Sequence, residues 1–326
     1  MSALKILAAT SAAFVAAAAS PCPAATPIGS TPTAREVMLL PAPPVQRFTA
    51  RDGTALAYRV FTPPAGVAPR LVAIIYHGSA GSSRNVTLLG EALAADGVVA
   101  YAPDVRGQGL SGRRGDVDYI GQPSDDLADF IPVIRKAYPD ARLALVGHSA
   151  GGGFVLRIAG EPLGRSFDRL VLISPYLGRA APTGRPDAGW TKIDMPRMVL
   201  LAGLNTVGIT AFNGATAIRF NLPPGAEAAG ATGRWSYRMA MSYGPDGETR
   251  LFGPPAFRED AARARAPIVL IAGARDEQFY AERYAAAFKG LEDKVRVEIA
   301  PNADHMGALA DPDALAMEVK AVEGEN

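Results

Sequence analysis

Five uninterrupted apolar runs of strand length constrain the fold of this chain more than any other feature. Continuous apolar strands are typical of parallel sheets that helices cover on both faces. Helix-like segments separate the runs, and a last strand and a last helix follow them. This alternation predicts an α/β fold with a mostly parallel sheet and crossover helices. The runs are LVAIIYHG (71–78), VVAYAPDV (98–105), RLALVGHS (142–149), RLVLISPY (169–176) and PIVLIAGARD (267–276), the helix candidates are 83–96, 124–138, 150–159 and 277–290, and the final strand and helix are 295–300 and 313–322.

Two further segments matter for the fold: one adds strands to the predicted core, and the other is inserted into it. Residues 45–63 read as two strands around Asp52-Gly53, a hairpin signal. Residues 178–258 carry Gly, Pro and scattered bulky apolar residues but no clear strand, so we expect a cap inserted into a core of 45–177 and 259–326. We expect the large apolar residues of the cap to hold it on the core and, in part, to line a pocket: Leu200, Leu201, Leu204, Ile209, Phe212, Ile218, Phe220 and Leu222.

The N-terminus has the pattern of a secretory signal peptide. Lys5 precedes a run of apolar and small residues (6–19) that ends in Ala17-Ala18-Ala19, and the run is short for a membrane span. We therefore expect a signal peptide at 1–19, an extended Pro/Ala-rich leader at 20–44, and a secreted or periplasmic protein without a stable membrane span. A retained anchor is the alternative. A net charge of +1 gives no reason to expect a nucleic-acid partner.

A G-x-S-x-G motif, Gly147 to Gly151, lies between a predicted strand and a predicted helix. In that position the motif is typical of a nucleophile elbow, a strained turn that presents the serine above the sheet edge. The small residues let strand and helix approach closely. A phosphate-binding turn is the alternative, but the segment lacks the P-loop lysine and the spaced G-x-G-x-x-G. Ser149 is therefore the candidate nucleophile.

A serine hydroxyl needs a base, and the chain has three histidines. His77 ends a strand and His148 adjoins the serine on the turn, so His305, after the last strand, is the expected base. Asp276 follows a late strand and lies between serine and histidine in the sequence, which favours it over Asp304 as the residue that orients the imidazole. Asp276 could also cap the helix that follows it.

The oxyanion formed by attack on a carbonyl needs hydrogen-bond donors. We expect them to be the backbone N–H groups of Ala150 and of Ser79, with Gly78 allowing the loop to turn tightly. The three histidines show no H-x-x-x-H or H-E-x-x-H spacing, which argues against zinc. No metal and no organic cofactor are expected.

With these motifs in view, the chain resembles the α/β-hydrolase superfamily over about residues 45–322. The segments YHGSAG, APDVRGQGLSGRRGDV, GHSAGG, GARDEQF and ADHMG resemble the series found in monoacylglycerol lipases and lysophospholipase-like serine hydrolases. The resemblance implies a cap, a mostly structural role for Asp104 and Arg106, and hydrolysis of a small-molecule or lipid-like carboxylic ester through an acyl-enzyme.

Two other functions remain open. A related aminopeptidase should carry an acidic cluster in the cap to receive an amine, but the acids there are dispersed, which favours a neutral substrate. A hydrolase-fold binding protein without activity would usually lack a triad residue, and none is missing here. The dispersed acids are Asp187, Asp194, Glu227, Asp246 and Glu248.

Overall fold

The computed structural model describes residues 34–64, 69, 71–227, 230–245 and 256–325, which belong to one structural unit. The predicted signal peptide (1–19) and most of the predicted leader lie outside these residues. So does part of the last stretch of the predicted cap, at 246–255.

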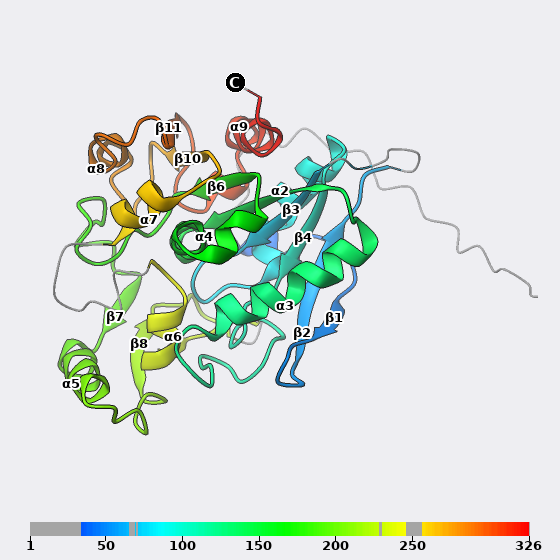
Figure 1. The fold of residues 1–326 in the computed structure, drawn as a ribbon. Helices are drawn as coiled ribbons and strands as arrows, with labels where there is room; N and C mark the ends of the chain where they lie inside the picture. Colours follow the sequence, from blue (N-terminus) through cyan, green and yellow to red (C-terminus); the bar gives the residue numbers. More distant parts are fainter. Residues whose placement is uncertain (1–33, 65–68, 70, 228–229, 246–255, 326) are drawn as a thin grey trace, which may run out of the picture. The chain divides into compact units, whose positions relative to one another are not determined.

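An eight-stranded sheet forms the centre of this unit (Figure 1). Its order is β1-β2-β4-β3-β5-β6-β10-β11; β1 pairs with β2 and β2 with β4 antiparallel, and every other neighbouring pair is parallel. The expected α/β class with a mostly parallel sheet is confirmed. The strands are β1 (Gln46–Thr49), β2 (Ala55–Phe61), β3 (Leu71–Tyr76), β4 (Val99–Pro103), β5 (Arg142–His148), β6 (Arg169–Ile173), β10 (Ile268–Gly273) and β11 (Val295–Ala300).

Helices cover both faces of the sheet, as the continuous apolar strands predict. Alternate residues of β3 enter two different buried clusters: Ile74 packs in the cluster that contains Phe154, and Ile75 in the one that contains Leu89. All six residues of β3 are buried. The first face carries α3 (Gln122–Ala137), α4 (Ala150–Gly160) and α7 (Phe257–Arg263), and the second carries α2 (Thr87–Ala95), which follows the 3₁₀ turn η1 (Ser83–Val86), and α9 (Pro312–Glu323).

The helix predicted at 277–290 forms only over residues 281–287. Only a 3₁₀ turn, η4 (Ala281–Arg283), and the four-residue α8 (Tyr284–Ala287) form there. The preceding segment is extended because Phe279 makes a β-bridge with Gly184, and the N–H of Tyr280 donates to the carbonyl of Thr183 (2.7 Å). A tertiary partner therefore replaces the first helical turns.

The expected extended leader is also wrong at its described end, where α1 (Ala34–Leu39) forms. Val37 is buried, and Arg84 donates from Nε to the carbonyl of Met38 (2.9 Å) and from Nη2 to that of Leu40 (2.7 Å). These bonds satisfy carbonyls at a helix end that would otherwise lack donor partners.

The predicted cap contains a second sheet, so the expectation that it has no strand is wrong. The strands β7 (Thr191–Ile193), β8 (Thr216–Phe220) and β9 (Arg234–Ser236) pair antiparallel, and Figure 1 shows β7 and β8 beside α5 (Met195–Thr206). The strands are three to five residues long, too short for a clear alternation of apolar and polar residues. The short α6 (Tyr237–Ser242) follows β9.

The large apolar residues of this segment divide into two groups. Ile218 and Phe220 are buried, as is Leu201, whereas Leu200 is 62% exposed and Phe212 60% exposed. The expectation that they hold the segment together or line a pocket therefore applies to only part of the set.

Candidate active site

Ser149 lies on a strained turn between β5 and α4. Its φ of 55° and ψ of −118° are unusual for a residue with a side chain. A Cβ on Gly147 would lie 2.3 Å from the carbonyl oxygen of Gly151, and one on Gly151 would lie 2.6 Å from the carbonyl oxygens of Tyr76 and His77. The two glycines of the motif are therefore required for the close approach of α4 to the strand ends.

Asp276 and His305 form a hydrogen-bonded pair. His305 Nδ1 lies 2.9 Å from Asp276 Oδ2, while Asp276 Oδ1 accepts the backbone N–H groups of Gln278 (2.8 Å) and Phe279 (2.9 Å). Burial opposes ionisation of Asp276, but the contact with His305 and the two backbone donors together lower the pKa of the carboxyl. The second carboxylate oxygen therefore fixes a loop, and the expected helix cap is wrong because the residues that follow Asp276 are extended.

Asp304, the competing carboxylate, faces elsewhere. Its Oδ1 accepts the N–H of Gly307 at 2.6 Å. This contact holds the turn after His305 and gives Asp304 a local structural role.

Ser149 and His305 line the same cavity, of about 150 Å³, together with Glu277 and Met306. The described residues show no hydrogen bond between Ser149 Oγ and His305 Nε2. In unliganded sites of this kind that bond is often long and tightens only when substrate binds. The structure therefore brings Ser149, His305 and Asp276 to one site, but Ser149 and His305 are not hydrogen-bonded to each other there.

The predicted oxyanion donors flank the same serine. A Cβ on Gly78 would lie 3.1 Å from Ser149 Cβ, a tight contact, so the loop that carries Ser79 approaches the serine closely. Ala150 is the first residue of α4, and an N–H in the first turn of a helix has no acceptor within the helix. The Oγ of Ser79 accepts a hydrogen bond from Trp190 Nε1 at 3.2 Å. This arrangement places residues 79 and 150 beside Ser149.

A second, larger cavity of about 530 Å³ also reaches Ser149. Ser79, Ala150 and Gln278 line this cavity together with Ser149, whereas His305 does not. Its walls are mostly apolar and come largely from the predicted cap: Tyr176, Trp190, Ile193, Ile218, Phe220, Trp235, Tyr243 and Phe279.

Solved structures share this architecture over most of the chain. A soluble variant of the monoglyceride lipase of Saccharomyces cerevisiae superposes with a TM-score of 0.61 at 17% identity, covering 87% of this chain and 94% of that one. The monoacylglycerol lipase of Paleococcus ferrophilus gives 0.58 at 21% identity, covering 82% and 98%. The chain has the α/β-hydrolase fold.

Sequence comparison relates part of the chain to monoacylglycerol lipases and cutinases. Residues 67–203 match the Hydrolase_4 family, described as serine aminopeptidase, S33. The monoacylglycerol lipase of Mycolicibacterium smegmatis is 28% identical over 152 residues (41% of this chain, 54% of that protein), and cutinase est1 of Thermobifida alba is 28% identical over 141 residues (40% of each). The chain spans about half the length of the curated relatives it matches. The family match includes Ser149 and ends before Asp276.

Two residues that the sequence did not indicate position His305. His148 donates from Nε2 to the carbonyl of His305 (2.9 Å), and Glu277 Oε2 accepts the N–H of His305 (3.1 Å). Burial, aided by the nearby His305, lowers the pKa of His148 to about 3, so its imidazole stays neutral. Both residues adjoin a predicted site residue in the sequence, which was the only available signal.

His77 and Tyr243 support the loop that carries Ser79. His77 Nδ1 donates to the carbonyl of Gly78 (2.8 Å) and its Nε2 accepts the N–H of Val105 (3.2 Å), while burial lowers the pKa of its imidazole. The Tyr243 hydroxyl donates to the carbonyl of His77. The predicted cap thus contacts this loop through a buried phenol as well as through Trp190.

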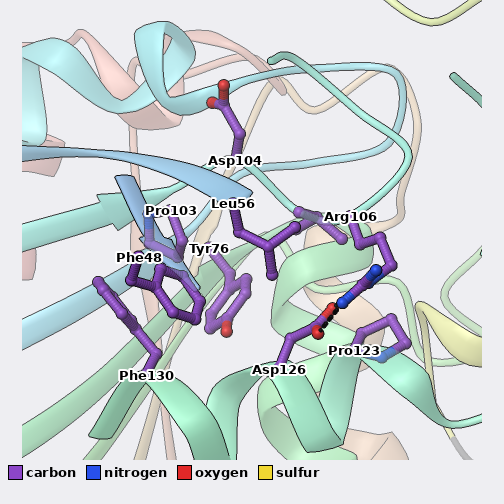
Figure 2. Close-up of a pocket in the computed structure, with 10 residues that line it drawn as sticks. Phe48, Leu56, Tyr76, Pro103, Asp104, Arg106, Pro123, Asp126 and Phe130 are labelled. Carbon is purple, nitrogen blue, oxygen red and sulfur yellow. Dashed lines mark hydrogen bonds and ion pairs between the residues drawn. The ribbon is translucent and has the colours of Figure 1, made fainter. Parts of the chain in front are cut away.

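Asp104 and Arg106 are structural, as the resemblance implied. Figure 2 shows Asp104 directed away from the ion pair that joins Arg106 to Asp126. Asp104 accepts the N–H groups of Ser83 (2.6 Å) and Leu110 (2.8 Å), and Arg106 also pairs with Asp52 at 2.9 Å. These contacts fix the loop that follows β4.

Over the described ranges, no helix is long and apolar enough to cross a membrane. The same residues hold no group of three or more His, Cys, Asp or Glu side chains that could bind a metal ion.

Proposed function

We propose that this chain hydrolyses carboxylic esters through an acyl-enzyme on Ser149. His305 takes the hydroxyl proton as Ser149 Oγ attacks the ester carbonyl, and Asp276 holds the imidazole in the required tautomer. The N–H groups of Ser79 and Ala150 stabilise the tetrahedral oxyanion. His305 then returns the proton to the leaving alcohol, and water cleaves the acyl-enzyme by the same steps.

One observation carries the proposal: a strained serine and a buried Asp276–His305 pair open onto one cavity. Strain, burial and a fixed imidazole orientation each cost free energy, and their coincidence beside Ser149 is expected of a nucleophilic site. The lipases and cutinases among the sequence relatives favour an ester, and a lipid-like one, as the substrate.

The two cavities suggest how an ester would lie. The leaving alcohol must receive its proton from His305, which lines the smaller cavity and not the larger one. We therefore place the alcohol in the smaller cavity and the acyl group in the larger, apolar one.

The test is a panel of esters of graded acyl length, run beside the matching amides. We expect hydrolysis of the esters, with amide turnover lower by orders of magnitude. Turnover of N-terminal aminoacyl amides at rates similar to the esters would contradict the proposal and favour a peptidase.

The aminopeptidase alternative follows from the description of the matched family. It would need a carboxylate beside the acyl group to receive the free amine. The described residues that line the larger cavity include no Asp or Glu. That lining disfavours the alternative. A protein without activity is disfavoured because all three triad residues are present.

We also propose that the chain is exported and cleaved near Ser20. The basis is the pattern of Lys5, the short apolar run and Ala17-Ala18-Ala19. Mass spectrometry of the natively exported protein should find a chain that begins near Ser20. An intact Met1 would contradict the cleavage.

A further inference from the structure

The larger cavity beside Ser149 has a positive lining. Arg179 and Arg185 both line it, and the other described lining residues carry no Asp, Glu, Lys or His side chain. In the described part of the chain, neither guanidinium lies within 4.0 Å of a carboxylate. The expectation of a neutral substrate took account only of acidic residues and so missed this charge.

Arg185 is held rigidly at the edge of the site. Its Nε donates to the carbonyls of Asp276 (2.9 Å) and Phe279 (3.2 Å), and its guanidinium stacks on Tyr280 with Cζ 4.1 Å from the ring centroid. These contacts use Nε and one face of the guanidinium plane, and no described partner takes the Nη groups. A fixed guanidinium with free N–H groups is suited to bind a planar carboxylate through two parallel hydrogen bonds.

The position of Arg179 adds to this charge. It is exposed and follows Gly178, another residue of the same lining. A cation near the cavity opening attracts an anionic substrate, and its effect weakens as salt is added.

We propose that the acyl group of the preferred substrate carries a carboxylate, bound by Arg185 with help from Arg179. The substrate class is then the half-ester of a dicarboxylic acid, whose apolar methylenes lie against the aromatic walls. This inference rests on the proposed ester hydrolysis and on the acyl group occupying the larger cavity.

Two matched series of 4-nitrophenyl esters test it: half-esters of dicarboxylic acids from four to ten carbons, and neutral monoacid esters of equal chain length. The readout is the ratio of kcat/KM for the anionic ester to that for its neutral partner. We expect a ratio of about 10 or more at one optimal chain length, falling as salt is raised.

Arg185→Gln should lower that ratio by roughly 10-fold, since it removes a charged hydrogen-bond donor. The ratio separates this effect from a structural one, because loss of the bonds to Asp276 and Phe279 would slow both series equally. Arg179→Gln should lower the ratio by about 3-fold. Arg219→Gln, an exposed arginine that does not line this cavity, should change neither series.

Other outcomes would overturn the inference. A ratio near one that the arginine substitutions do not change, with neutral esters still hydrolysed, would refute it and leave ester hydrolysis standing. A preference for 1-acylglycerol 3-phosphate over 1-monoacylglycerol, without a preference for the half-esters, would place the anion on the alcohol and refute the acyl placement. No hydrolysis of either series would instead refute the proposed function.

Discussion

At the scale of single residues, the two carboxylate oxygens of Asp276 have different partners. One oxygen accepts from the imidazole of His305 and the other from two backbone N–H groups of its own loop. The backbone bonds hold the carboxylate in place, so the proposed reaction would need little reorganisation when the imidazolium forms. The lowered pKa of Asp276 keeps it ionised at neutral pH.

Asp276→Asn should reduce kcat by a factor on the order of 10⁴ with KM little changed. The amide can still accept from the loop, but its NH₂ group would face His305 and favour the wrong tautomer. Steady-state kinetics with a 4-nitrophenyl ester measures the change. Asp304→Asn is the matched control and should retain most activity; a comparable loss there, with Asp276→Asn active, would show that the wrong carboxylate was assigned.

At the scale of elements, α9 carries an unusual buried acid. Glu318 faces the second buried face of the sheet and is fully buried, and among the described residues neither carboxyl oxygen has a hydrogen-bond partner. Burial, with a smaller contribution from Asp311, raises the pKa of Glu318 well above its ordinary value. Burial therefore favours the protonated form of this side chain in the folded protein.

This predicts that stability falls as pH rises above the ordinary pKa of glutamate. Between the ordinary pKa of glutamate, about 4.3, and the raised value, the folded state binds more protons than the unfolded state, so the free energy of unfolding falls as pH rises. Glu318→Gln should remove this slope and be more stable than the wild type by a margin that grows with pH. Denaturant unfolding at pH 5, 7 and 9 measures it. The exposed Glu282→Gln is the control, and an identical pH slope in Glu318→Gln would contradict the prediction.

The helices and strands that the sequence predicted correctly are those whose residues within the element itself determine the structure. The five long strands and α2, α3, α4 and α9 follow from apolar runs and their spacing, and the elbow from its glycines. The three short strands of the cap and the extended segment at Phe279 depend instead on partners far away in the sequence, such as Gly184. His148 and Glu277 were missed for the same reason, because their role lies in contacts with the backbone of His305.

At the scale of the whole molecule, the cap strands supply much of the larger cavity's wall. Phe220 lines it and packs against Trp235 with ring centroids 5.0 Å apart, whereas Phe212 of the same segment is exposed and does not line it. An acyl chain in this cavity would bury its methylenes against aromatic surface, each contributing about 0.8 kcal/mol.

We therefore predict that kcat/KM for neutral esters rises roughly fourfold per added methylene, from acetate to medium chains, before the cavity is full. Phe220→Ala should flatten this dependence, and Phe212→Ala should leave it unchanged. Initial rates over the ester series measure both. A monotonic fall from acetate upward would mean that the acyl site accepts only short chains.

The most direct test of the central claim, that Ser149 is the nucleophile, is labelling with a fluorophosphonate followed by peptide mass spectrometry. The account predicts a single adduct on Ser149 in the wild-type protein, and neither adduct nor ester hydrolysis in a folded Ser149→Ala variant. Undiminished labelling of that variant, or an adduct on another residue, would contradict it.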